Sequence, residues 1–176
     1  MRTTLAALHK ALPPQAVIVG DLCGLVYAAW SLFPSHRPRS FLYPVGAGPL
    51  GFGLPGAIGA AVAWPGTPVV ALVGDGGLQF SLQELAVAVE QSLPILILLW
   101  NNRSLGEVAH HLGDNFANFD PATPLPDFAR LCSAYRVPHV LCPSAADVGQ
   151  ALCRADVQRT LAGRGGPMMV EVLSVQ

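Results

Sequence analysis

Charged residues are scarce in this chain of 176 amino acids. Only 12% of its residues are charged, Lys10 is the only lysine, and the formal net charge is −1. Globular chains usually carry about 25% charged residues. The shortage of basic residues excludes the cationic surface on which nucleic-acid binding depends. A chain with so little charge is also expected to hide part of its surface against another chain.

Long apolar runs are missing as well, although 52% of the residues are hydrophobic. The longest run, from Leu93 to Trp100, has eight residues, whereas a membrane helix needs roughly 20. The first ten residues contain neither the long apolar region nor the cleavage signal of a secretory peptide. We therefore expect no membrane span and no export. The ample apolar content also excludes a disordered chain.

The cysteines show no pairing pattern. None of them stands in a C-x-x-C pair, and no histidine lies at a metal-ligand spacing from them; they are Cys23, Cys132, Cys142 and Cys153. Disulfide frameworks are typical of smaller, secreted chains. We therefore expect reduced, mostly buried thiols in a cytoplasmic protein.

Short apolar strands alternate with helical segments along the chain. The expected strands are Ala16–Gly20, Ser40–Tyr43, Pro68–Val73, Pro94–Trp100, Val137–Leu141 and Pro167–Leu173. The expected helices are Thr3–Leu12, Leu25–Phe33, Leu54–Ala63, Ser81–Gln91, Asp127–Tyr135 and Ala145–Leu161, the last capped by Ser144. Continuous apolar strands separated by helices predict an α/β fold, with a parallel sheet covered on both faces. No linker or repeat divides residues 1–176, so we expect a single domain.

Glycines and polar side chains gather where three of the expected strands end. These places are Gly46–Gly48, Gly74–Gly77 and Asn101-Asn102. Ligands of open α/β sheets bind outside the carboxyl ends of the strands. If the three strands are neighbours, the sequence predicts one crevice between these segments.

Two of these segments carry oxygen ligands. Asp75 offers a carboxylate and Asn102 an amide oxygen, which together suit Mg²⁺, because this ion takes few protein ligands and adds phosphate oxygens and water. Gly76 and Gly77 leave backbone N–H groups open to a phosphate near the start of a helix. Taken singly, Gly-Asp-Gly is more often a plain strand-to-helix turn, and Asn-Asn more often a loop.

The spacing of the two segments is more specific than either alone. Gly74-Asp75-Gly76 is followed by 24 residues and then by Asn101-Asn102. This arrangement resembles the thiamine diphosphate (ThDP) binding motif of the acetolactate synthase and 2-oxoacid decarboxylase family, which begins with GDG and ends with NN. The flanking stretches GPLGFGLPGAIGAAVAWPGTPVVALVGDGGLQFSLQEL, PDFARLCSAY and GPMMVEV resemble the same family. The resemblance implies the ThDP-binding fold from about Ala16 onward.

The resemblance also implies a magnesium and diphosphate site. The Asp75 carboxylate, the Asn102 side chain and the Ser104 carbonyl would be the metal ligands. Gly76, Gly77 and the backbone around Gly106 would hold the diphosphate; these residues and Asn102 are the expected cofactor contacts, together with Gly48 and Leu50.

Leu50 occupies the family's bulky apolar position beneath the cofactor. The resemblance implies that it forces the two rings of ThDP into a bend, while its N–H and the Gly48 carbonyl bond the aminopyrimidine. The bend brings the 4′-amino group against the thiazolium carbon whose proton it takes. The alternative for Leu50 is an ordinary core leucine.

Side chains just beyond the metal-binding loop approach the substrate in the family. Glu107 holds such a position here, so we expect it with Leu50 among the catalytic residues; the alternative is a solvated helix residue. His110 and His111 follow, and their role stays open, since catalytic histidine pairs of relatives belong to another domain.

Two positions depart from the family. Relatives often have Ser or Thr after GDG, with the hydroxyl on a phosphate, but Gly77 stands there. The tip of the first strand is Gly20-Asp21-Leu22-Cys23-Gly24, where relatives often carry polar side chains that touch the diphosphate. These departures predict modest affinity for the cofactor.

The largest departure is a missing domain. Family enzymes usually join three domains in one chain, and the first supplies a glutamate that bonds the pyrimidine ring. The 176 residues have room for the diphosphate domain only. The resemblance then implies a split enzyme, as in two-subunit sulfopyruvate decarboxylases. We expect a heteromer with a pyrimidine-domain subunit, at least two copies of each, acting on a small 2-oxoacid and inactive without that partner. Nothing in this half selects the oxoacid, or decides between protonation and ligation of the product.

Two other functions fit parts of the sequence. Gly46–Gly51 matches G-x-G-x-x-G, and Asp75 lies 24 residues beyond Gly51, as in an NAD-binding Rossmann domain. That hypothesis leaves Asn101-Asn102 unexplained. The second is a non-catalytic regulatory or assembly subunit that retains the ThDP fold, against which the intact pair of Asp75 and Asn102 argues.

Overall fold

The computed structural model describes residues 1–112 and 125–174. Its sheet has six strands, all parallel, in the order β2-β1-β3-β4-β6-β5. The strands are β1 (Val17–Gly20), β2 (Phe41–Leu42), β3 (Val69–Gly74), β4 (Ile95–Asn101), β5 (His139–Cys142) and β6 (Met168–Leu173). Every expected strand forms, with its ends displaced by no more than two residues.

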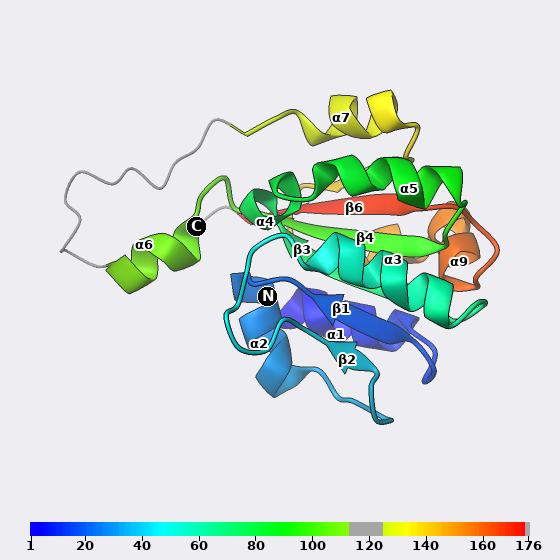
Figure 1. Cartoon of the computed structure of the whole chain (residues 1–176), viewed down its shortest axis with the longest axis horizontal. Coiled ribbons are helices and arrows are strands. Elements are labelled where there is room, and N and C mark those ends of the chain that lie inside the picture. Colours follow the sequence, from blue (N-terminus) through cyan, green and yellow to red (C-terminus); the bar gives the residue numbers. More distant parts are fainter. Residues whose placement is uncertain (113–124, 175–176) are drawn as a thin grey trace.

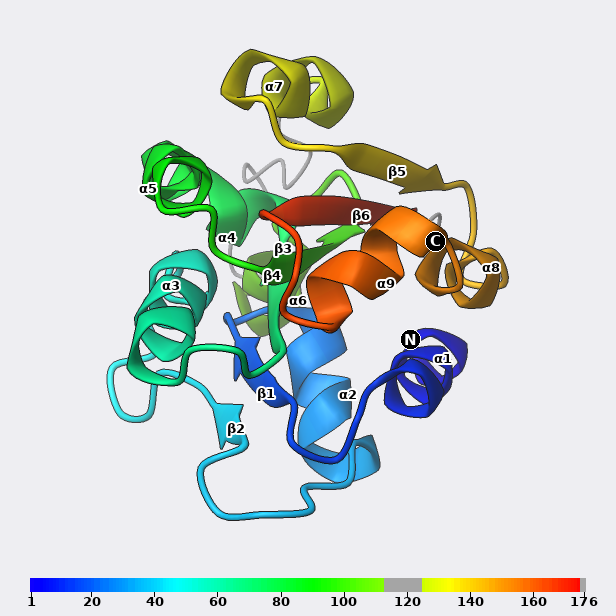
Figure 2. The ribbon, with the colours of Figure 1, turned by 90° about the vertical axis from the view of Figure 1, so that its right-hand side faces the viewer.

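Helices cover both faces of the sheet, as the sequence predicts (Figure 2). One face carries α1 (Arg2–Ala11), α2 (Gly24–Leu32), α8 (Val148–Leu152) and α9 (Ala155–Leu161). The other carries α3 (Gly53–Ala63), α5 (Leu85–Glu90) and α7 (Phe128–Tyr135). The short helices α4 (Asp75–Gln79), η1 (Leu82–Glu84) and α6 (Gly106–Leu112) follow the strand ends or connect to α5.

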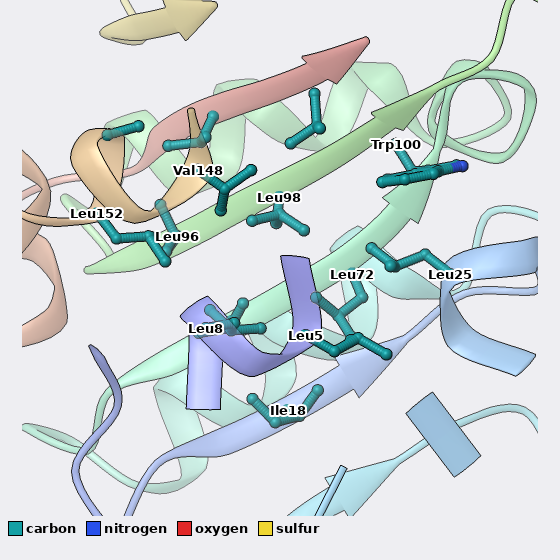
Figure 3. Close-up of a cluster of buried hydrophobic side chains, with 14 of the residues drawn as sticks. Leu5, Leu8, Ile18, Leu25, Leu72, Leu96, Leu98, Trp100, Val148 and Leu152 are labelled. Atoms are coloured by element: carbon teal, nitrogen blue, oxygen red, sulfur yellow. The ribbon is translucent and has the colours of Figure 1, made fainter. Parts of the chain in front are cut away.

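The strands read as continuous apolar runs because both of their faces are buried. In β3, Val70 and Leu72 pack in the cluster beneath α1 and α2, whereas Ala71 and Val73 pack in the cluster beneath α3. Figure 3 shows the first cluster, in which Leu5 and Leu8 of α1 lie over the sheet.

The expected helix Ala145–Leu161 is wrong, because two helices occupy this range. The backbone is extended at Arg154 (ψ 143°), which precedes α9, and the Arg154 guanidinium binds the Asp156 carboxylate at 2.7 Å. The Ser144 hydroxyl donates to Asp147 Oδ2 at 2.8 Å in the turn before α8. These local side-chain bonds compete with a continuous helix.

The carboxyl ends of the strands form the edge that matters for function. α4 begins at Asp75, directly after β3, so Gly76 and Gly77 lie in the first turn of a helix. α6 follows β4 and lies beyond the strand ends (Figure 1). Within the described ranges, no helix combines the length and apolar character required to cross a bilayer.

Candidate functional site

A cleft of about 450 Å³ opens at the carboxyl ends of the strands. Eight of the nine candidate residues line it: Leu50, Asp75, Gly76, Gly77, Asn102, Ser104, Gly106 and Glu107. Gly48 does not line the cleft. A Cβ atom at Gly48 would lie 2.7 Å from Cδ1 of Leu22, which does line it. The structure thus gathers the segments that follow β1, β3 and β4 around one cavity, together with Leu50.

Asp75 is a buried carboxylate, only 3% exposed, at the start of α4. Its Oδ1 accepts the Gly76 N–H at 2.7 Å, and its Oδ2 accepts the Arg103 N–H at 2.7 Å. Burial raises the pKa of Asp75, and these backbone N–H groups offset the rise only in part. A carboxylate oxygen has more than one lone pair, so both oxygens keep the capacity to bind a cation.

The loop after β4 is held in an unusual backbone conformation. Arg103 has φ +56°, in the left-handed region that side chains other than glycine rarely adopt. In this conformation the Arg103 N–H donates to Asn101 Oδ1 at 3.1 Å as well as to Asp75. The Ser104 N–H donates to Asn102 Oδ1 at 3.3 Å. The loop therefore directs its polar groups toward the Asp75 side of the cleft.

The donor set of this cleft fits magnesium. A carboxylate, an amide oxygen and a backbone carbonyl, from Asp75, Asn102 and Ser104, are available on its lining, and hard cations prefer such oxygens. In the part of the chain that the structure describes, no three His, Cys, Asp or Glu side chains cluster as a metal site. An ion bound here would need further oxygens from a ligand, as Mg²⁺ takes from phosphates.

Two glycines on the cleft lining allow the backbone to approach neighbouring side chains closely. A Cβ atom at Gly76 would lie 2.5 Å from Leu105 Cδ2, and one at Gly106 would lie 2.9 Å from Asn102 Nδ2. Only glycine fits such distances without displacing its neighbour. The start of α4 thus lies against the Leu105 side chain, and the start of α6 lies against the Asn102 amide.

Asp21 is the polar residue that sequence reasoning missed. It follows β1, its carboxylate is fully buried, and it accepts N–H bonds from Leu22 at 2.7 Å and from Gly51 at 3.0 Å. Burial raises the pKa of Asp21, partly offset by backbone N–H bonds. The signal was present, because a charged residue directly after a buried strand is unusual in a chain so poor in charge.

Asp21 also explains why glycine follows Gly74-Asp75-Gly76. A Cβ atom at Gly77 would lie 2.8 Å from Asp21 Oδ2. Because the Asp21 carboxylate is held by backbone N–H groups, it has little freedom to move away. The side chain that relatives often carry at this position is therefore excluded by a neighbour from the first strand.

Glu107 belongs to α6 and faces the start of α2. A Cβ atom at Gly24 would lie 2.8 Å from Glu107 Oε1. Burial, followed by the negative charge of Glu107, raises the pKa of Tyr27 on the same cleft wall. Glu107 is half-buried, so its carboxylate belongs to the cleft rather than to a fully solvated helix face.

The remaining candidates are less informative. His110 lines the cleft, whereas the side chain of His111 lies outside the part that the structure describes.

Cys23 lines the cleft too, but burial raises its pKa to about 12, which excludes a thiolate nucleophile at neutral pH. All cysteines are free, and three of them are buried, as the sequence predicts.

Comparison with known proteins finds a family model that matches most of the chain. Residues 21–172 match the family model described as "Thiamine pyrophosphate enzyme, C-terminal TPP binding domain". A probable 2-ketoarginine decarboxylase of Pseudomonas aeruginosa is 42% identical over 141 residues, which are 74% of this chain and 25% of that protein. The large subunit of acetolactate synthase isozyme 3 of Escherichia coli is 39% identical over 139 residues, or 76% of this chain and 24% of that subunit.

A solved structure shows the same fold. The ThDP-dependent 4-hydroxybenzoylformate decarboxylase of Rhodococcus jostii RHA1 superposes with a TM-score of 0.84 at 27% identity. The superposition covers 99% of this chain and 32% of that one. This chain therefore spans about a quarter of the curated relatives and about a third of the solved one.

Proposed function

The chain belongs to the thiamine pyrophosphate (ThDP) enzymes, as their C-terminal TPP-binding domain, and on that premise we propose that it is the diphosphate- and metal-binding subunit of a split 2-oxoacid decarboxylase or carboligase. The subunit is one domain, its cofactors are ThDP and Mg²⁺, and it works in the cytoplasm. Membership in this family excludes the hypothesis of an NAD-binding domain. Gly46–Gly51 is then the segment that brings Leu50 to the cleft.

One observation carries the proposal. The buried Asp75 carboxylate and the Asn102 amide stand at the ends of the neighbouring strands β3 and β4, in a cleft that Leu50 also lines. Asp75, Asn102 and the Ser104 carbonyl are assigned to Mg²⁺. The backbone of Gly76, Gly77 and Gly106 is assigned to the diphosphate, and Gly48 and Leu50 to the pyrimidine side.

The chemistry divides between the cofactor and the chain. When bound, ThDP would supply the thiazolium carbon that adds to the ketone, and its thiazolium ring would accept the electron pair left when carbon dioxide departs. The chain's own residues bind and orient. Asp75 and Asn102 would place the metal, the backbone of Gly77 and Gly106 would present N–H groups to the diphosphate, and Leu50 would present an apolar surface that sets the orientation of the rings. The Gly76 N–H is donated to Asp75 Oδ1, so Gly76 would contribute to the diphosphate site through its lack of a side chain.

Exposed apolar side chains around the cleft support a partner chain. Val45 is 80% exposed in the loop that leads to Leu50, and Phe80 is 66% exposed at the end of α4. Phe80 also packs against the backbone of Gly51. Exposed apolar groups in the segments next to a cleft are typical of an interface. We assign this rim to a pyrimidine-domain subunit, in a heteromer with at least two copies of each chain.

The charge of the cleft favours one class of substrate. Its lining includes the carboxylates of Asp75 and Glu107, but neither lysine nor arginine among the lining residues described. With Asp75 assigned to the metal, Glu107 is the second acidic residue on this lining, and we assign it to substrate recognition. A 2-oxoacid with a cationic tail suits such a site, and one relative is a probable 2-ketoarginine decarboxylase.

This substrate class is tested by the Glu107→Gln variant of the assembled enzyme. A hydrogen bond to a charged group contributes about 1.5–3 kcal/mol. The variant is therefore expected to lower kcat/KM for 2-ketoarginine about 10- to 100-fold more than kcat/KM for pyruvate. Equal losses on both substrates would remove Glu107 from substrate recognition.

The cofactor assignment is tested by calorimetric titration of ThDP into the assembled enzyme, with Mg²⁺ and with EDTA. Binding is expected with Mg²⁺ and not with EDTA, and the Asp75→Ala variant is expected to lose it. Undiminished affinity of that variant would exclude Asp75 from the metal site. An enzyme that binds ThDP through Asp75 but turns over no 2-oxoacid would favour the regulatory or assembly subunit instead.

A further inference from the structure

A buried carboxylate outside the cleft remains unexplained by the proposed function. Glu171 stands in β6, between β4 and the edge strand β5, and is only 6% exposed. Its Oε1 accepts a hydrogen bond from Asn101 Nδ2 at 2.6 Å, and its Oε2 lies 2.8 Å from His139 Nε2. Burying an acidic group costs free energy unless it is well bonded, so this contact between three strands calls for a reason.

The contact continues to the metal-binding loop. Asn101 is the last residue of β4, and its Oδ1 accepts the Arg103 N–H at 3.1 Å. The same N–H donates to Asp75 Oδ2 at 2.7 Å. A chain of polar contacts therefore runs from His139 and Glu171 through Asn101 and the Arg103 backbone to Asp75.

Glu171 determines which way the Asn101 amide points. Burial acts to raise the pKa of Glu171, but hydrogen bonds from His139 and Asn101 outweigh it and leave the pKa below its usual value. The group is therefore a carboxylate, which accepts hydrogen bonds but cannot donate one. Asn101 must turn its NH₂ group toward Glu171 and its oxygen toward Arg103.

The orientation of Asn101 matters because Arg103 is strained. A left-handed conformation at a residue other than glycine costs on the order of 1–3 kcal/mol and persists only where the surroundings enforce it. With its oxygen directed at the Arg103 N–H, Asn101 supplies one such constraint, and Asp75 supplies the other. Asn102 and Ser104 flank Arg103, so this turn sets the position of both assigned metal ligands.

We propose that Glu171 is a positioning residue for the metal-binding loop. Through Asn101 it holds the left-handed turn at Arg103, and His139 holds Glu171 in place. The effect of Glu171 on metal affinity rests on the proposed function, whereas its effect on the conformation of the loop does not. Partners of metal ligands are known to change metal affinity about 10- to 100-fold when they are removed.

Two variants and a control test the proposal. Glu171→Ala removes the acceptor of Asn101. Glu171→Gln keeps an oxygen for Asn101 and offers an NH₂ group to His139, so it is the conservative rescue. Val170→Ala is the control, because Val170 is a buried neighbour on the same strand that packs in the cluster beneath α1 and α2.

The first readout is hydrogen exchange of the Arg103 amide in the chain without cofactor. Glu171→Ala is expected to accelerate this exchange about tenfold or more beyond any change in global stability, and Glu171→Gln less than about threefold. The second readout is ThDP affinity of the assembled enzyme in Mg²⁺, with an expected loss of about 10- to 100-fold for Glu171→Ala. Val170→Ala is expected to lower stability but to change neither readout specifically.

The proposal is overturned if the Arg103 amide of Glu171→Ala exchanges only as much faster as the loss of global stability requires, as is expected for Val170→Ala. If Glu171→Ala does not fold, His139→Ala removes only the outer contact at the sheet edge, and unchanged Arg103 exchange in that variant overturns it equally. Failure of the wild-type enzyme to bind ThDP would contradict the proposed function. Accelerated exchange of the Arg103 amide in Glu171→Ala would still support the role of Glu171 in the loop.

Discussion

Asp75 is held in surroundings that favour its uncharged form. Burial raises the pKa of Asp75 in the folded chain. At pH values between the usual pKa and this raised pKa, the folded chain therefore binds more protons than the unfolded chain. Stability therefore falls as the pH rises through this range. Above this range, where Asp75 is charged, the metal-free chain is less stable than it would be if burial left this pKa unchanged. A bound cation would offset that cost.

The Asp75→Asn variant removes this titrating group, so its stability relative to the wild type is expected to increase in EDTA as the pH rises. The amide has one acceptor oxygen where the Asp75 carboxylate accepts two N–H groups, so the change with pH is the readout rather than the absolute Tm. Each kcal/mol changes Tm by about 2–4 °C in a chain of this size, and thermal unfolding from pH 4 to pH 7 measures the change. Asp156→Asn is the control, since an exposed bond to Arg154 lowers the pKa of Asp156 and its loss is not expected to produce the same trend. A stability difference between Asp75→Asn and the wild type that stays constant with pH would contradict this linkage.

Asp21 and Gly77 form a pair whose substitutions are expected to couple. In Gly77→Ala the new methyl group meets Asp21 Oδ2 at 2.8 Å, so the carboxylate must leave the Gly51 N–H. Such overpacking costs about 1–3 kcal/mol. In an Asp21→Ala background the space is open, and the cost of Gly77→Ala is expected to fall by at least about 0.5 kcal/mol. Urea unfolding of the four chains measures this coupling, and additive free energies would exclude it.

Helix α3 shows how one element combines close packing with exposed positions. A Cβ atom at Gly53 would lie 2.6 Å from Val73 Cγ1, whereas one at Gly59 would meet nothing within 4 Å. Gly53→Ala is expected to destabilise the chain by about 1–3 kcal/mol through overpacking. Gly59→Ala is expected to stabilise it by about 0.5–1 kcal/mol, because alanine favours the helix. Chemical unfolding distinguishes the two, and equal effects would show that α3 does not approach β3 this closely.

The elements differ in how far the sequence determines them. The strands were predictable because their apolar runs are continuous. The spacing between Gly74–Gly76 and Asn101-Asn102, with the family resemblance that it carries, was sufficient to predict most of the candidate residues that line the cleft. The break at Arg154 was not predictable, because arginine favours helices and only its bond to Asp156 marks the end. The contact between Asn101 and Glu171 joins residues 70 positions apart, and no local pattern predicts such a pair.

At the scale of the whole molecule, the apolar rim around the cleft is the feature that points to a partner. Val45→Glu and Phe80→Glu place charges in this rim and are expected to weaken the heteromer at least about tenfold. Val62 is 60% exposed on the far part of α3, so Val62→Glu is the control and is expected to leave assembly unchanged. Light scattering after gel filtration measures assembly. Weakening by Val62→Glu alone would move the interface away from the cleft.

In the proposed enzyme, this chain supplies the diphosphate and metal half of a ThDP site and a second chain supplies the pyrimidine half. The most direct measurement is the rate of carbon dioxide release from 2-oxoacids with ThDP and Mg²⁺, by the purified chain alone and after mixing with a pyrimidine-domain subunit. We predict no turnover alone, turnover in the mixture, and its loss when the mixture contains Asp75→Ala. Turnover by the chain alone, or a mixture indifferent to Asp75→Ala, would contradict the claim.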